Sequence, residues 1–123
     1  MNGNSALLDS NIIIYLSKRE VPLSFLDQFD THYISVITYI EVLGYQFRDA
    51  KDEEFIRNIL EVFSVLFIDQ KIADMAIEIR KKQRIKLPDA IIAATAKVLD
   101  LCLVTRNIDD FKKVEIQIAN PFD

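Results

Sequence analysis

Short apolar runs alternate along this chain with longer segments whose apolar residues recur at helical spacing. The runs at 6–9, 32–36, 65–69 and 101–105 predict strands, and 116–118 predicts a further strand at an edge. Helices are predicted at 11–18, 38–48, 52–64 and 70–84, with a short helix after Pro22 and another that begins at Pro88. Strands that alternate with helices form a parallel sheet covered by helices on both faces. The sequence therefore predicts an α/β fold with a central, mainly parallel sheet of four to five strands.

The length of 123 residues, half of them hydrophobic, predicts one compact domain spanning 1–123. A chain of this size buries about two-thirds of its unfolded surface, so it needs neither a disulfide nor a structural metal. Its single cysteine, Cys102, stands in an apolar run and is expected to be a small core residue. No basic region precedes an apolar stretch at the N-terminus, and no apolar run approaches the roughly 18 residues that cross a bilayer. We expect a cytoplasmic protein without membrane contact.

The net charge is modestly negative, with 15 basic and 19 acidic side chains, which disfavours a uniformly basic surface. The basic residues are clustered instead. Five of the seven residues at 80–86 are basic, and Arg106, Lys112 and Lys113 follow later in the chain. This pattern predicts either a contact with phosphates or cations that complement the dipole at a helix end.

Acidic residues stand where the predicted strands end or the following helices begin: Asp9, Glu41, Asp89, Asp109 and Asp110. In open parallel sheets ligands bind at the carboxyl ends of the strands, near the point where the strand order reverses. Each acid also has a structural interpretation. Glu41 fits a capping box that begins at Thr38, Asp9 can cap a helix, Asp89 follows Pro88 in a first helical turn, and Asp110 can be a solvated loop residue.

Asp109 and Asp110 are adjacent and count as one position, so four acidic positions meet at one end of the predicted sheet. Carboxylates there would repel one another and raise one another's pKa values unless cations neutralised them. Mg²⁺ and Mn²⁺ prefer oxygen ligands, whereas zinc prefers cysteine and histidine. The only histidine, His32, stands at the start of a predicted strand and is expected to be structural or exposed. With two glycines in the chain, a glycine-rich phosphate loop is not expected. The acids therefore predict a magnesium or manganese site.

Four segments together resemble the motifs of PIN-domain ribonucleases, and most closely those of the VapC toxins of type II toxin–antitoxin pairs. They are Leu8-Asp-Ser-Asn11, Ser35-Val-Ile-Thr-Tyr-Ile-Glu41, Leu87-Pro-Asp-Ala-Ile-Ile-Ala-Ala-Thr95 and Leu103-Val-Thr-Arg-Asn-Ile-Asp-Asp-Phe111. The similarity extends from residue 6 to the Ile118-Ala-Asn-Pro121 tail. It implies a three-layer α/β/α domain with a metal-dependent RNA-cleaving site, which pairs as a homodimer and is inhibited by a cognate antitoxin.

The resemblance also implies roles for individual residues. Asp9, Glu41 and Asp89 match the first three acids of the family's metal site, and Asp110 matches the fourth because Phe111 follows it; Asp109 remains an alternative. Asn11, Thr105 and Asn107 match supporting polar positions. Ser10 stands where the family often has threonine, so a hydroxyl is retained.

These residues suggest a mechanism in which Mg²⁺ or Mn²⁺ is held by Asp9, Asp89 and Asp110, with Glu41 in direct or water-mediated contact. The ion would activate a water for attack on a phosphodiester. Single-stranded RNA is the expected substrate, because side chains can read little of an A-form helix. Arg84, Lys86 and Arg106 are expected to bind its phosphates.

Other functions fit parts of the pattern. A receiver domain of a response regulator has a similar length and an acidic Mg²⁺ site, and Asp69 would be its phosphoacceptor. However, Asp9 is followed by Ser10 rather than a second acid, and no Lys-Pro step appears. A catalytically silent PIN-like binding module is a second alternative. A DNA nuclease and a ribosomal RNA processing enzyme are also compatible with the motifs.

Overall fold

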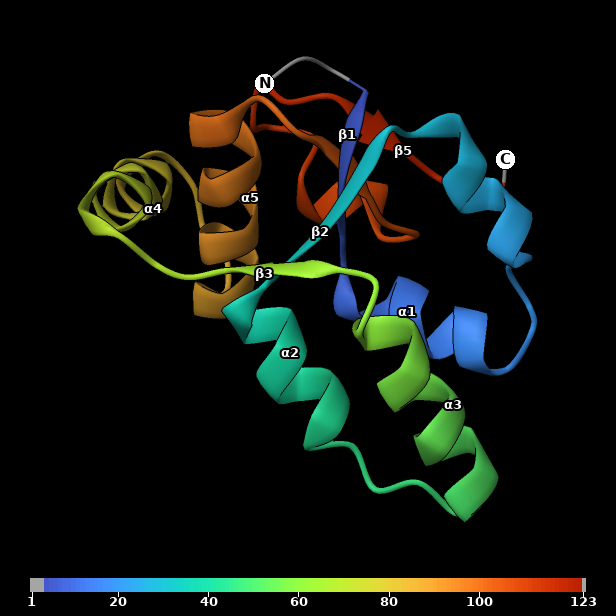
Figure 1. Cartoon of the computed structure of the whole chain (residues 1–123). Helices are drawn as coiled ribbons and strands as arrows, with labels where there is room; N and C mark the ends of the chain where they lie inside the picture. Colours follow the sequence, from blue (N-terminus) through green and yellow to red (C-terminus); the bar gives the residue numbers. More distant parts are fainter. Residues whose placement is uncertain (1–3, 123) are drawn as a thin grey trace.

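The computed structural model describes residues 4–122. Its centre is a five-stranded sheet in which every pairing is parallel (Figure 1). The strands are β1 (Ser5–Leu8), β2 (Thr31–Ser35), β3 (Ser64–Leu66), β4 (Cys102–Val104) and β5 (Ile118–Ala119), in the order β3-β2-β1-β4-β5. The predicted α/β fold with a parallel sheet is thereby confirmed, including a fifth strand at the edge.

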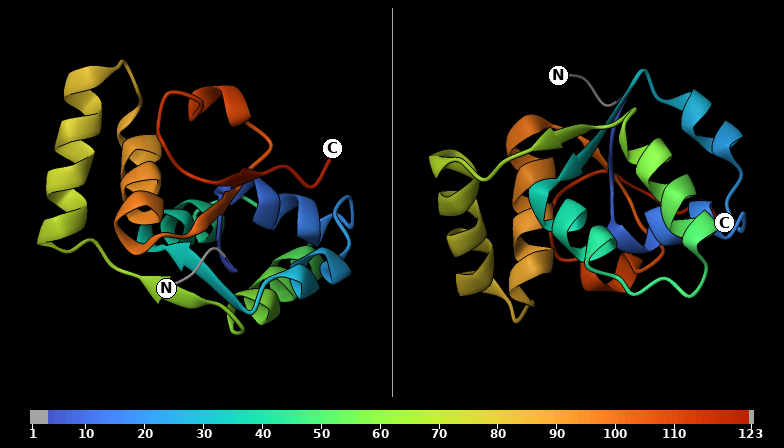
Figure 2. Two further views of the ribbon diagram at one scale, coloured as in Figure 1. Left: turned by 90° about the horizontal axis from the view of Figure 1, so that it is seen from above. Right: turned by 60° about the horizontal axis from the view of Figure 1, so that its bottom comes forward.

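Helices cover both faces of this sheet (Figures 1 and 2). Helix α5 (Leu87–Leu99) packs on one face, and α4 (Gln70–Lys82) lies outside it against α5. The other face carries α1 (Ser10–Ser17), α3 (Ala50–Leu60) and the 3₁₀ segment η1 (Leu23–Gln28). Each face has its own hydrophobic core, because the strand side chains alternate: Leu7 belongs to one core, and Ala6 and Leu8 belong to the other.

Helix α2 (Val36–Leu43) differs from its predicted range of 38–48 at both ends. It begins two residues earlier because the Ser35 hydroxyl accepts a hydrogen bond from the backbone N–H of Ile37 and so caps it. With the cap at Ser35, Glu41 lies well inside the helix, and the capping-box interpretation of Glu41 is wrong. The helix ends at Leu43, and Gly44 caps it by donating its N–H to the Ile40 carbonyl. A Cβ at Gly44 would lie 2.9 Å from that oxygen.

The strand order reverses between β1 and β4, because the chain moves from β1 to β2 on one side and later returns to β4 on the other. Asp9 follows β1 directly, and Thr105 follows β4 directly. The backbone N–H of Asp9 donates to the Val104 carbonyl at 2.9 Å and ties the two strand ends together. The topology therefore places these two residues side by side at the carboxyl end of the sheet, where α/β folds bind ligands.

Among the described residues, no helix has the length and apolar character required to span a bilayer.

Candidate functional site

Asp9 is a buried carboxylate at the carboxyl end of β1, with only 6% of its surface exposed. Its Oδ1 accepts the Ser10 backbone N–H at 2.8 Å and so caps α1. Its Oδ2 accepts the Thr105 hydroxyl at 2.8 Å. Burial raises the pKa of Asp9, these two hydrogen bonds lower it, and the neighbouring charges of Glu41 and Asp110 raise it further. The helix-capping interpretation is therefore correct for Asp9, but it accounts for only one of its two oxygens.

Of the three predicted supporting residues, Thr105 and Asn11 contact Asp9, and Asn107 contacts Thr105. The fully buried Thr105 hydroxyl donates to Asp9 and accepts the backbone N–H of Asn107 at 3.1 Å. Asn107 thus supports the site through its main chain. The Asn11 side-chain amide donates a long hydrogen bond of 3.5 Å to Asp9, while its Oδ1 is buried and has no partner among the described residues.

Glu41 reaches the site from α2, on the helix that follows β2. Its Oε1 accepts the Ser10 hydroxyl at 2.6 Å, and that hydroxyl lies 3.5 Å from the Thr38 hydroxyl. The sequence motifs did not assign this positioning role to Ser10. A hydroxyl one residue after the Asp9 carboxylate, in the first turn of a predicted helix, is the signal that could have indicated it.

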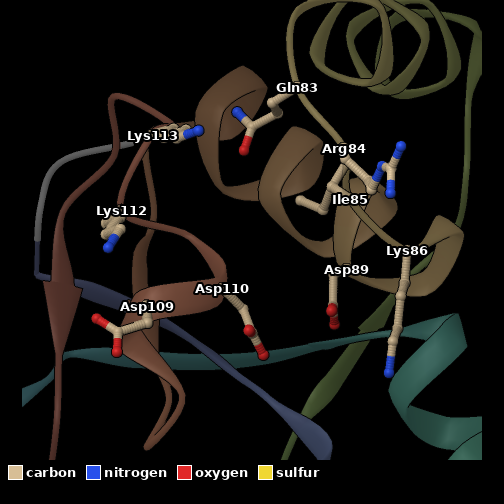
Figure 3. Close-up of a pocket in the computed structure, with 9 residues that line it drawn as sticks. All are labelled: Gln83, Arg84, Ile85, Lys86, Asp89, Asp109, Asp110, Lys112 and Lys113. Carbon is tan, nitrogen blue, oxygen red and sulfur yellow. The ribbon is translucent and has the colours of Figure 1, made fainter.

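Asp89 and Asp110 complete the acidic group. Asp89 lies in the first turn of α5, whose amino end reaches the same sheet edge because α5 leads back to the start of β4. Asp110 lies in the 3₁₀ segment η2 (Ile108–Asp110) that follows β4. Figure 3 shows the two carboxylates pointing toward one region, whereas the Asp109 side chain points away from it. This geometry favours Asp110 over Asp109 as the fourth acid.

Electrostatic coupling joins the four acids into one cluster. The pKa of Asp89 is raised to about 6, first by burial and then by the charges of Asp9, Asp110 and Glu41, while Lys86 lowers it. Within the described part of the chain, the single ion pair joins Arg57 to Glu53, so none of the four carboxylates is paired with a cation. The pKa of Asp89 therefore lies well above that of an ordinary aspartate.

The donor set fits a hard divalent cation, since it consists of carboxylate oxygens supplemented by the unpartnered Asn11 Oδ1. In their present conformations, no three His, Cys, Asp or Glu side chains of residues 4–122 are arranged to hold a metal ion. Mutual repulsion opposes a closer approach of the acids unless a cation offsets it. Asp110 is exposed, so its side chain can rotate toward Asp9. His32 lies elsewhere, with its Nε2 2.6 Å from the Leu26 carbonyl.

Basic side chains adjoin the acids on one side. A hollow of about 480 Å³ has Asp89 and Asp110 in its lining together with Arg84 and Lys86, which precede α5 (Figure 3). Both basic residues are exposed. The structure thus brings these two predicted phosphate-binding residues next to the acids.

Arg106 is placed differently from Arg84 and Lys86. Its guanidinium lies 4.4 Å from the ring centre of Phe122 and 5.3 Å from that of Tyr15, and it donates a hydrogen bond to the Tyr15 hydroxyl at 2.9 Å. The two rings also meet edge to face at 4.9 Å. Arg106 therefore fastens the C-terminal tail to α1, a contact that the sequence motifs did not indicate. It also lines a second hollow with Asn107 and Asp110.

Asp69, which would be the phosphoacceptor of a receiver domain, instead caps α4 by accepting the backbone N–H of Ile72 at 2.9 Å. It follows the edge strand β3, two strands away from Asp9. This position gives the receiver interpretation no support.

Comparisons with known proteins identify similar folds. A family model described as the PIN domain matches residues 6–117. Among solved structures, a toxin–antitoxin complex from Klebsiella pneumoniae contains a chain with 34% identity and a TM-score of 0.76, with 96% of this chain and 98% of that one covered. The structure of FitAcB from Neisseria gonorrhoeae contains a chain with 28% identity and a TM-score of 0.77, with 95% of this chain and 98% of that one covered. The structure of VapBC2 from Rickettsia felis, bound to a promoter DNA fragment, contains a chain with 22% identity and a TM-score of 0.80, with 94% of this chain and 98% of that one covered. A search of curated proteins gave no significant match.

Proposed function

The chain belongs to the PIN domain family, and from this membership we propose that it is a metal-dependent endoribonuclease that acts as the toxin of a toxin–antitoxin pair. The observation that carries the proposal is the cluster of four carboxylates at the strand-order reversal, with Asp9 buried and the pKa of Asp89 raised to about 6. Holding such a cluster together costs stability in the absence of a cation. A protein that retains it therefore gains function from it rather than stability.

Asp9, Asp89 and Asp110 would hold Mg²⁺ or Mn²⁺, with Glu41 in direct or water-mediated contact. When bound, the ion would supply Lewis-acid activation of water and stabilisation of negative charge on the phosphodiester. Thr105 holds Asp9 in place through its hydroxyl, and Ser10 holds Glu41. Because both hydroxyls donate to carboxylates, they keep the acids oriented, and the Thr105 hydrogen bond also lowers the pKa of Asp9.

Single-stranded RNA is the proposed substrate, because the open carboxyl end of the sheet can accept an unstacked RNA strand. Arg84 and Lys86 are exposed beside Asp89 and would contact its phosphates. Arg106 borders the hollow on the other side of Asp110, where its guanidinium is held by Tyr15 and Phe122. The Arg106 guanidinium would contact an RNA phosphate without first having to be ordered, because both rings already hold it in place.

An antitoxin partner is proposed from the toxin–antitoxin complexes of Klebsiella pneumoniae and Neisseria gonorrhoeae to which this chain is similar. A basic residue of the antitoxin would occupy the carboxylate cluster in place of metal. An arginine suits this role, since it forms two parallel hydrogen bonds with a carboxylate and supplies no activated water. If changing the partner's basic residues one at a time never relieves inhibition, this mode of inhibition is wrong.

A homodimer is also proposed, from apolar side chains exposed on α2 and after β3. Ile40 is 61% exposed, Phe67 is 70% exposed, and Tyr39 is also exposed.

Cleavage of single-stranded RNA by the purified chain tests the proposed activity. We expect cleavage with Mg²⁺ or Mn²⁺, loss of cleavage with EDTA, and loss in Asp9→Asn and Asp89→Asn variants that remain folded. Cleavage that persists after rigorous chelation would contradict the metal-dependent mechanism. A chain that binds its antitoxin but cuts no RNA with either ion would be a silent binding module.

A further inference from the structure

Two lysines that the family motifs do not assign form the wall opposite Arg84 and Lys86. Lys112 and Lys113 follow η2, and both are exposed on the far side of the 480 Å³ hollow (Figure 3). Among residues 4–122, none of these four basic residues forms an ion pair. Four cations without an ion pair, from two separate chain segments, thus line one hollow.

The carboxylates occupy one end of this hollow. Figure 3 shows Asp89 and Asp110 pointing together at its lower end, while Gln83 and Lys113 lie at the upper side. A polyanion drawn in by the basic residues would thus have part of its backbone beside the acids. Cations alone would suit any anion, but their position next to the proposed reaction centre favours the substrate's own backbone.

The hollow also continues away from the acids. A neighbouring hollow of about 280 Å³, distinct from the one that Arg106 lines, shares Gln83 and Lys113 with the 480 Å³ hollow, and Lys82 and Lys97 add two cations to its lining. Glu78 and Glu115 line it as well, as Asp89, Asp109 and Asp110 line the first hollow, so each hollow has one more basic than acidic side chain. Because the two hollows share Gln83 and Lys113, they adjoin, and together they form a groove bordered by residues 82–86 and 112–115.

We propose that this groove binds the RNA phosphates on one side of the cleaved bond, with Lys112 and Lys113 on one side of the RNA strand and Arg84 and Lys86 on the other. The inference rests on the proposed ribonuclease function and adds a path for the substrate to it. Contacts with phosphates bind without reading sequence, so the groove contributes affinity and orientation. The RNA strand would then leave the reaction centre toward Lys82 and Lys97.

Steady-state cleavage of a single-stranded RNA by a Lys112→Ala/Lys113→Ala variant tests the proposal. We expect a rise in KM on the order of tenfold with little change in kcat, because phosphate contacts act on binding. The plot of log(kcat/KM) against log salt concentration should become shallower by about 0.7 for each phosphate that the variant no longer binds. A Lys112→Arg/Lys113→Arg variant keeps both charges and should retain the wild-type KM.

Lys51→Ala/Lys71→Ala is the matched control, since it removes the same charge from exposed positions on α3 and α4 that line neither hollow. If the groove variant gives the same KM and salt dependence as this control, the groove proposal is overturned. It is also overturned if only antitoxin binding weakens, because the surface then serves the partner protein. If the wild-type chain cleaves no RNA with Mg²⁺ or Mn²⁺, it is instead the proposed function that fails.

The direction of the groove has its own test, in a Lys82→Ala/Lys97→Ala variant. We expect its KM to rise for RNA extended on one side of the cut and to stay unchanged for RNA that ends close to the cut on that side. An equal rise for both substrates would show that the strand does not run along this groove.

Discussion

Asp9 combines two tasks in one carboxylate, since one oxygen caps α1 and the other accepts the Thr105 hydroxyl. The four acids were indicated by their positions after predicted strands or on the helices between them. Thr105 was indicated by the family resemblance. The sequence motifs did not indicate Ser10 as the partner of Glu41, since that hydrogen bond joins residues 31 positions apart in the chain. Side-chain pairing across two helices depends on packing, which no local pattern encodes.

Asp89 should make the metal-free protein less stable as pH rises. Its pKa is raised from 3.8 to about 6 in the folded state, so its stabilising contribution is fully present below 3.8 and is lost as pH rises through 6. In EDTA at pH 8, Asp89→Asn should therefore be more stable than wild type by on the order of 1 kcal/mol, after allowance for solvent screening. The difference should vanish near pH 4 in urea unfolding.

Asp109→Asn is the control for this measurement, because it removes the same charge from a side chain that points away from Asp89 (Figure 3). If Asp89→Asn lowered stability at pH 8, the carboxylate would be stabilising the amino end of α5 through the helix dipole, as in its structural interpretation.

Ser10→Ala should slow RNA cleavage by about tenfold without raising KM, because Glu41 would lose the hydroxyl that orients it. Ser10→Thr keeps a hydroxyl and should restore kcat. Single-turnover cleavage of both variants, with thermal unfolding to show that they are equally folded, makes the comparison. Equal rates for Ser10→Ala and wild type would remove Ser10 from the site.

At the scale of elements, the strands were predictable because each is a short apolar run flanked by helical segments. The helix ends were less so. Helix α2 begins at Val36 because the Ser35 side chain caps it, whereas Thr38 offered an equally good local signal. At the last strand, pairing with β4 decides the outcome: β5 is Ile118–Ala119 rather than 116–118, since those residues align with Leu103 and Val104.

The packing of the C-terminal tail on α1 gives a prediction at this scale. Phe122→Ala removes a ring that packs against Tyr15 and lies under the Arg106 guanidinium, so it should cost roughly 0.5–1 kcal/mol of stability. Phe122→Tyr keeps the ring and should be neutral. Urea unfolding of the two variants distinguishes them, and identical midpoints would mean that the tail contributes nothing to stability.

At the scale of the whole molecule, two cores enclose the sheet and leave apolar side chains exposed on α2 and after β3. Sedimentation at micromolar concentration should give a homodimer, and Ile40→Glu should convert it to a folded monomer because it places a charge in an apolar interface. Lys51→Glu on α3 is a control that also introduces a negative charge. A wild-type monomer would contradict the dimer, and an Ile40→Glu dimer would place its interface elsewhere.

Calorimetric titration of Mg²⁺ or Mn²⁺ into the metal-free chain, at pH 6 and pH 8 in buffers of different ionisation enthalpy, tests the central claim most directly. If the four carboxylates form one metal site, binding should release protons at pH 6, where Asp89 is partly protonated, and fewer at pH 8. Asp89→Asn should lose both the binding and the proton release, whereas Asp109→Asn should retain them. Absence of binding in the wild type, or unchanged binding in Asp89→Asn, would contradict the account.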